Sequence, residues 1–309
     1  MQSVKEASDR HLRMLETSFG KAVMQLLQRD DVIEVMLNPD GRIWVDSLEH
    51  GKYDTEYTIS DVQAHNIIKL VATYQDTSVD ADHPELSCEL PGSGERFQGW
   101  LPPVVERPCF AIRKKALKIL SLDEYRENGG ISQQQQQQLI EAVRTHMNII
   151  VAGGTSSGKT TFANALLNEL KDTNDRLLVL EDLPELQVSA PDTVKLRTSS
   201  HKSMRDLVRG VLRMRPDRII VGEVRDGAAL DMLKAWNTGH PGGICTIHAN
   251  SAHSVVARLE DLIREVVATV PRRLIEQAID LVVFMERDRE GRHSVKEILN
   301  MNQEHDPSY

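Results

Sequence analysis

One short run of residues combines glycines, a lysine and a hydroxyl at the spacing that phosphate binding requires. The run follows the pattern G-x-x-x-x-G-K-[S/T] at every fixed position, and it consists of Gly153, Gly154, Thr155, Ser156, Ser157, Gly158, Lys159 and Thr160. Glycines let successive backbone N–H groups turn toward phosphate oxygens, the lysine reaches the β- and γ-phosphates, and the hydroxyl binds Mg²⁺. The run therefore predicts a binding site for a nucleoside triphosphate with Mg²⁺.

Two apolar runs that read as strands each end in an acidic residue. Residues 218–222 lead to Glu223, which would lie beside the phosphate loop if the two strands were neighbours. Glu223 is the candidate for orienting and activating the attacking water, because hydrolysis needs a group that polarises water. A second interpretation is that Glu223 caps the next helix or pairs with Arg225.

The other run, residues 177–180, is followed directly by Glu181 and Asp182. Either acid could hold Mg²⁺ through water or position the nucleophile, and Glu181 is preferred because it directly follows the strand. Asp182 could instead cap a turn before Pro184, since aspartate side chains accept backbone hydrogen bonds there.

A third polar group follows a glycine-rich turn near residue 240. Thr246, His248 and Asn250 alternate along a predicted strand and so share one face. His248 could sense the γ-phosphate or link the site to a neighbouring subunit, and a structural hydrogen-bonded histidine is an equal alternative. The histidines and Cys245 lack the spacing of a zinc site.

Length and composition favour a two-domain protein of ordinary globular character. The chain has 309 residues, a net charge of −9 and three widely spaced cysteines, which favour reduced thiols in the cytosol. The negative charge argues against general nucleic-acid binding, because neutralising phosphates needs a cationic face. No apolar run approaches the roughly 20 residues that span a bilayer, so we expect any membrane association to be peripheral or through a partner.

The hydrophobic patterns divide the chain into two parts. The pattern in residues 1–115 predicts a small α+β domain with helices at 8–29 and 60–74, a hairpin at 32–46, and strands within 86–112. A linker is expected at 116–130, ending in a double glycine, and the six-glutamine run after it reads as a solvated helix face. From residue 131, alternating elements predict a parallel sheet covered by helices, with the nucleotide at the carboxyl ends of its strands. The expected strands are 148–152, 176–181, 193–197, 218–222, 243–247 and 280–285, and the expected helices are 161–170, 203–213, 227–237, 253–268 and 272–278.

These motifs, in this order, resemble the secretion-superfamily traffic ATPases of type IV secretion and conjugation systems, in particular the TrbB-type conjugal transfer ATPases. Residues 153–161, which include Thr161, match the Walker A signature of that family. The Asp-box, Walker B and His-box signatures correspond to 180–186, 212–225 and 238–250, and residues 89–97 and 110–114 agree as well. The chain lacks the paired-CxxC insertion that related type II secretion and pilus ATPases often carry.

The resemblance implies an α/β fold with an N-terminal PAS-like domain and a C-terminal RecA-like P-loop motor domain at 131–309. It implies an Mg²⁺-dependent ATPase in which Lys159 and Thr160 hold phosphates and Mg²⁺ and Glu223 is the catalytic glutamate. Glu181 would support the metal and the water, and His248 belongs to the histidine box. Arg113 matches an arginine that reaches phosphate, with a salt bridge at the domain hinge as the alternative. Further candidates for a transition-state charge are Arg96, Arg205, Arg209 and Arg213.

At the level of the cell, the resemblance implies a homohexamer that powers pilus biogenesis and substrate transfer in a conjugative type IV secretion system. Its expected partners are inner-membrane components of the channel, with a cytoplasmic location at the periphery of the inner membrane. No direct sequence-specific nucleic-acid binding is expected. The alternatives are a pilus-retraction or type II secretion ATPase, and a nucleotide-dependent scaffold without turnover.

Overall fold

The computed structural model describes residues 2–47, 50–75, 77–114, 119–199, 201–288 and 291–301, with side chains from residue 12 onward. The chain divides into two compact units, Met1–Leu117 and Lys118–Tyr309. Within the described part of the chain, no helix is both long and apolar enough to cross a membrane.

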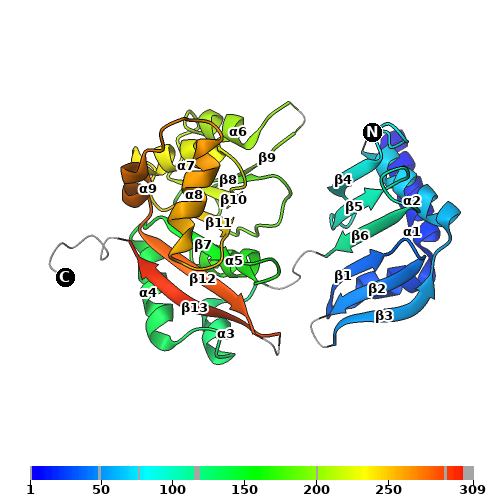
Figure 1. Ribbon diagram of the computed structural model, residues 1–309, viewed down its shortest axis with the longest axis horizontal. Coiled ribbons are helices and arrows are strands. Elements are labelled where there is room, and N and C mark those ends of the chain that lie inside the picture. The colour runs from blue at the N-terminus through cyan, green and yellow to red at the C-terminus, as the bar shows by residue number, and fades with distance from the viewer. Residues whose placement is uncertain are drawn as a thin grey trace. The chain divides into compact units, whose positions relative to one another are not determined.

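The first unit is a six-stranded antiparallel sheet with two helices on one face (Figure 1). The strand order is β3-β2-β1-β6-β5-β4, and the helices α1 (Gln2–Gln28) and α2 (Asp61–Tyr74) confirm the two that the sequence predicts. Gly20, at φ 77°, breaks the regular geometry of α1. The strands are β1 (Val32–Leu37), β2 (Arg42–Ser47), β3 (Gly51–Thr58), β4 (Glu85–Glu89), β5 (Arg96–Trp100) and β6 (Cys109–Arg113).

The second unit contains a seven-stranded sheet of order β13-β12-β7-β11-β10-β8-β9. All neighbouring pairs are parallel except β12 with β13, which form an antiparallel hairpin. In chain order, the strands β7 to β12 confirm the six predicted strands within two residues at each end, whereas β13 was not predicted. The strands are β7 (Ile149–Gly153), β8 (Leu177–Glu181), β9 (Thr193–Arg197), β10 (Arg218–Glu223), β11 (Ile244–His248), β12 (Leu281–Arg287) and β13 (His293–Asn300).

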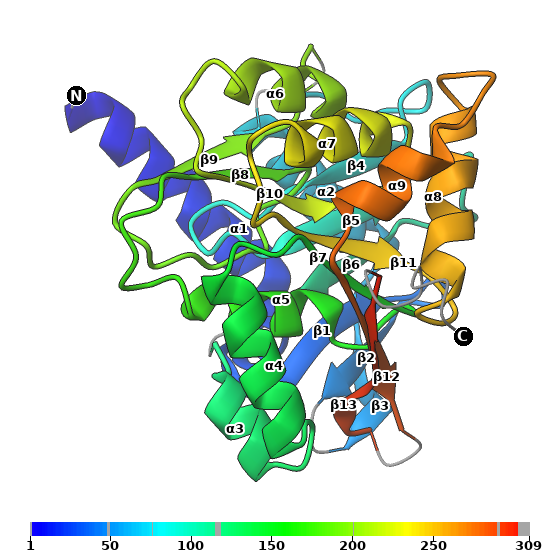
Figure 2. The same cartoon turned by 90° about the vertical axis from the view of Figure 1, so that its left-hand side faces the viewer.

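Helices cover both faces of this sheet (Figure 2). One face packs on α3 (Leu122–Glu127), α4 (Gln133–Arg144) and α5 (Lys159–Asn168). The other packs on α6 (Met204–Val211), α7 (Ala228–Asn237), α8 (Ser254–Arg264) and α9 (Arg272–Ala278). Alternate residues of β7 enter the two cores: Ile149 and Val151 face α5, and Ile150 and Ala152 face the opposite layer. Burial on both faces explains why the central strands are apolar throughout.

The segment predicted as a linker, 116–130, is in part a helix. α3 begins with a capping box at Ser121, and its Leu122 and Tyr125 are buried in the core of the second unit. The following glutamine run lies on a helix and is mostly solvated, as predicted, with Gln133, Gln134 and Gln137 exposed, but one member differs. Gln136 is buried, accepts a hydrogen bond from Arg126 at 3.1 Å and donates one to Asp123 at 2.9 Å. A polar side chain at a helix–helix contact is stable there because both of its polar atoms are paired.

The backbone just before β11 tolerates no side chain at Gly243. A Cβ atom at this position would lie 2.0 Å from the buried ring of Trp236, whose indole nitrogen donates to the Ile219 carbonyl at 3.0 Å. Because the ring cannot move without breaking that hydrogen bond, Gly243→Ala should lower the free energy of unfolding by about 1–3 kcal/mol. Urea unfolding followed by circular dichroism measures the change.

The matched control is Gly210→Ala in α6, where nothing lies within 4 Å of the added Cβ. Alanine is the better helix former, so this variant should be more stable by about 0.5–1 kcal/mol. Equal stability of the two variants would contradict the packing described for Trp236.

Candidate functional site

The glycine-rich run forms a loop between the end of β7 and the start of α5. Ser156 (φ 57°) and Gly158 (φ 88°) adopt the left-handed conformation, and a Cβ on Gly158 would approach the His293 ring to 2.9 Å. Gly158 is the N-cap residue of α5, and it has no side chain that could accept hydrogen bonds from the first N–H groups of the helix. Such a helix start attracts anions through its first N–H groups and its dipole.

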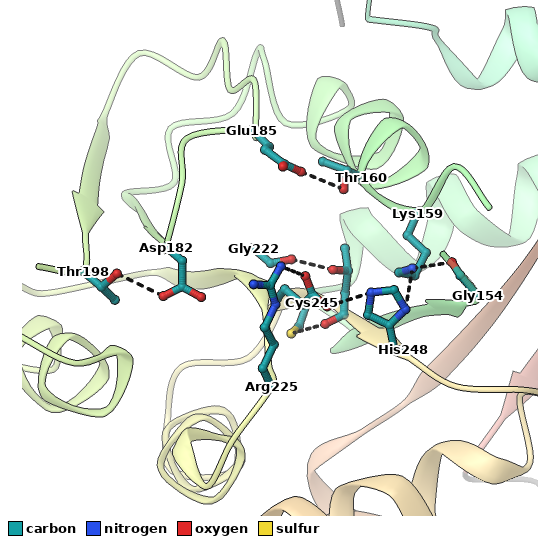
Figure 3. A network of polar contacts seen from close by, with 12 residues as sticks. Gly154, Lys159, Thr160, Asp182, Glu185, Thr198, Gly222, Arg225, Cys245 and His248 are labelled. Atoms are coloured by element: carbon teal, nitrogen blue, oxygen red, sulfur yellow. Dashed lines mark hydrogen bonds and ion pairs between the residues drawn. The ribbon is translucent and has the colours of Figure 1, made fainter. Parts of the chain in front are cut away.

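Lys159, the first residue of α5, is folded back over this loop. The residue is 8% exposed, and Nζ donates a 2.7 Å hydrogen bond to the Gly154 carbonyl. Nζ also lies 3.4 Å from Nδ1 of His248 (Figure 3). The ammonium group is thus held between the glycine-rich loop and the end of β11 (Ile244–His248).

His248 ends β11, which lies between the strand of the phosphate loop and the strand of Glu223. These two strands are therefore not neighbours, which was the condition for the predicted placing of Glu223. The imidazole bridges the gap instead, since its Nε2 lies 3.1 Å from Glu223 Oε1. Burial, and then the charge of Lys159, lower the pKa of His248, which favours the neutral ring at physiological pH.

Glu223, at the end of β10, has two oxygens in different surroundings. Arg225 donates to Oε2 at 2.6 Å, so the predicted alternative of an Arg225 pair is present. Oε1 is buried, and among the described residues it accepts no hydrogen bond, although His248 is near. A buried carboxylate oxygen without a donor is costly, and such atoms commonly belong to functional sites.

The acids that follow β8 have separate surroundings. Glu181, 4% exposed, accepts hydrogen bonds from the backbone N–H groups of Glu185 at 2.8 Å and Leu186 at 2.7 Å. Burial raises the pKa of Glu181, and the two N–H donors oppose this rise. Asp182 accepts a hydrogen bond from the Thr198 hydroxyl at 3.0 Å. Glu181 therefore holds the loop that follows it.

Thr160 meets a different acid from the one predicted. Its hydroxyl lies 3.3 Å from Glu185 Oε2, to which it donates (Figure 3). Asn164, one turn further along α5, fixes the same loop by donating to the Glu185 carbonyl and accepting from the Gln187 N–H. Sequence reasoning did not single out Glu185 or Asn164. The available signal was the four-residue spacing of Thr160 and Asn164 on one helix face.

The candidate arginines lie in different places. Arg113 ends β6 in the first unit, opposite Arg96 on β5 in the sheet register. Arg205 and Arg209 both pair with Asp231 of α7, at 2.6 and 2.9 Å, and so tie α6 to α7. Their positions are explained by this structural contact.

The match to known proteins covers nearly the whole chain. The "Probable conjugal transfer protein TrbB" of Sinorhizobium fredii is 43% identical over 294 residues, covering 94% of this chain and 90% of that protein. The "Type IV secretion system protein VirB11" of Bartonella quintana is 30% identical, with 89% and 90% covered. The crystal structure of the VirB11 ATPase of Brucella suis, in complex with sulphate, has a TM-score of 0.52 at 25% identity and covers 96% and 97%.

The family model described as "Type II/IV secretion system protein" matches residues 20–306. Fold, motif order and relatives agree with this match, and the chain belongs to the family of type II/IV secretion system proteins.

Proposed function

We propose that this chain is an ATPase that hydrolyses ATP to power a conjugative type IV secretion system. The observation that carries the chemistry is the line of contacts from the phosphate loop through Lys159 and His248 to the buried oxygen of Glu223. Lys159, the proposed phosphate-binding cation, and the buried Oε1 of Glu223 therefore lie on opposite sides of one imidazole. The family and the TrbB and VirB11 relatives support the physiological assignment.

Phosphate binding rests on the loop and on Lys159. The bound triphosphate takes the N–H groups at the start of α5, and Nζ exchanges the Gly154 carbonyl for phosphate oxygens. Thr160 and an acid of the loop after β8 are the residues that would hold Mg²⁺, which neutralises charge on the phosphates when bound. Oxygen donors of this kind fit Mg²⁺.

Glu223 acts on the attacking water. Its Oε1 takes the hydrogen bond of the water and its developing proton, while Arg225 keeps the carboxylate in position through Oε2. His248, neutral because of its lowered pKa, lies between the two charged groups, with Nδ1 3.4 Å from Lys159 Nζ and Nε2 3.1 Å from Glu223 Oε1. When Lys159 moves onto phosphate, its contact with the His248 ring changes, and the same ring contacts Glu223.

Assembly and partners are part of the same proposal. The chain works as a homohexamer at the cytoplasmic periphery of the inner membrane and docks on membrane components of the channel. Arg113 supplies a positive charge to the phosphates in the assembled ring. The support is the resemblance of the whole chain to conjugal transfer and type IV secretion proteins.

Two alternatives differ in cargo or in turnover. A pilus-retraction or type II secretion motor would share the site, and pilin genes beside the coding sequence would favour it. A scaffold that binds ATP without hydrolysis would not need an oxygen such as Glu223 Oε1 left without a donor. That oxygen favours turnover.

The first test concerns the phosphate-binding cation. Lys159→Ala removes the ammonium group but leaves the loop backbone, so ATP affinity should fall by about 10- to 100-fold, as for the loss of a hydrogen bond to a charged group. Isothermal titration with ATP and Mg²⁺ measures the change. Unaltered affinity would contradict the assignment of residues 153–160 as the phosphate site.

The second test separates binding from hydrolysis. Glu223→Gln keeps the shape of the side chain but is a far weaker base, so turnover of Mg²⁺-ATP should fall by about 10²- to 10⁴-fold with ATP affinity preserved. Phosphate release in steady state, compared with the parent at equal oligomeric mass, gives the rate. The matched control is Glu260→Gln, because Glu260 pairs with Arg264 on α8, outside the contacts of the site. Parental turnover in Glu223→Gln would exclude this residue as the group that activates water.

A further inference from the structure

The hairpin of β12 and β13 brings a histidine against the phosphate loop. β13 is the red edge strand in Figure 1, and His293 is its first residue. The His293 ring occupies the space beside Gly158, since a Cβ atom on Gly158 would lie 2.9 Å from Nδ1 and 3.1 Å from Cγ. The histidine therefore contacts the phosphate loop at the N-cap residue of α5.

The nitrogen of His293 that lies against Gly158 is a polar atom in a buried place. Nδ1 is buried, and within the described part of the chain it makes no hydrogen bond. A neutral imidazole carries one N–H donor and one acceptor nitrogen, so Nδ1 can take either role. Because a buried polar atom without a partner is costly, such an atom often belongs to a functional site.

The peptide that joins Ser157 to Gly158 offers an acceptor for this nitrogen. Burial lowers the pKa of His293 and the Ser157 backbone opposes this shift, which is the effect of a carbonyl group beside the ring. The peptide is trans, so its carbonyl oxygen and its N–H point in opposite directions. A Ser157 carbonyl held toward His293 thus turns the Gly158 N–H the other way. That N–H belongs to the loop whose backbone cradles the phosphates.

The strand that carries His293 is fixed from both sides. β12 pairs with it in antiparallel register. On the other side, the Val295 N–H donates to the Gly130 carbonyl at 2.9 Å, and a Cβ on Gly130 would lie 3.0 Å from the His293 carbonyl oxygen. Gly130 follows α3, whose Tyr125 packs edge-on against Phe162 of α5 with ring centroids 5.0 Å apart. The segment of α3 and Gly130 therefore holds both β13 and the helix that follows the phosphate loop.

We propose that His293 is a positioning residue of the phosphate loop. In the nucleotide-bound loop its Nδ1–H donates to the Ser157 carbonyl and so directs the Gly158 N–H at a phosphate oxygen. This inference rests on the proposed function, because the phosphates must bind at the loop. Residue 158 is then glycine for two reasons, its left-handed φ of 88° and the ring that occupies the place of a Cβ.

The experiment compares three substitutions by isothermal titration of the full chain with ADP and Mg²⁺. His293→Asn places a donor where Nδ1 lies, His293→Gln places one where Nε2 lies, and His293→Leu has neither. We expect His293→Leu and His293→Gln to lower ADP affinity by about 10- to 100-fold, as for the loss of one hydrogen bond to a charged group. His293→Asn should restore most of that loss.

Steady-state hydrolysis of ATP gives the second readout. The Gly158 N–H contacts phosphate before and during the reaction, so His293→Leu should raise KM for ATP more than it lowers kcat. Lys296→Gln is the matched control on the same strand, because Lys296 is exposed and pairs with Glu286 of β12. It should bind ADP as the parent does.

The two proposals fail in different ways. Parental affinity in His293→Leu, or equal affinity in His293→Asn and His293→Gln, would overturn the role of Nδ1 and leave the proposed function intact. A parent chain that binds no ADP would overturn both. Should His293→Leu unfold, the comparison of His293→Asn with His293→Gln still decides, since both variants carry the same amide group.

Discussion

The central constraint in this molecule is the order of three parallel strands, β7, β11 and β10. Because parallel strands end at the same edge of a sheet, Glu223 and His248, the last residues of β10 and β11, lie in one region with Lys159, which follows β7. β11 is the middle strand, so the imidazole of its last residue, His248, lies between Lys159 and Glu223. Had β10 paired directly with β7, there would be no place for a histidine between them, and the contact between loop and acid would be direct.

Burial affects the protonation of His248 and the hydrogen bonding of Glu223. The sheet has apolar cores on both faces, so its carboxyl edge is the place where charged side chains of the central strands can gather. Partial burial favours neutral His248, and leaves one oxygen of Glu223 without a donor. At the same edge, the loop after β8 is tied down by Glu181 and Asn164. Rigid strands thus support a site in which two long side chains are held by single polar contacts, Lys159 by the Gly154 carbonyl and Arg225 by Glu223 Oε2.

The sequence predicts some parts of this site far better than others. The phosphate loop is predictable because its chemistry requires a local pattern, and the strands are predictable from their apolar runs. Strand neighbours are not, since periodicity does not specify which strands pair. Glu185 was missed because its importance depends on a contact across 25 residues. Gln136 was taken as solvated because a polar run hides the one member that two partners bury.

A structure of the full chain with ADP, aluminium fluoride and Mg²⁺, determined by electron cryo-microscopy, would show the contacts of Lys159 and Glu223 during hydrolysis. We expect Lys159 Nζ to leave the Gly154 carbonyl for the fluoride, and the attacking water to lie within hydrogen-bonding distance of Glu223 Oε1. Lys159 still bonded to Gly154, or a water held by another residue with Glu223 turned away, would contradict this expectation.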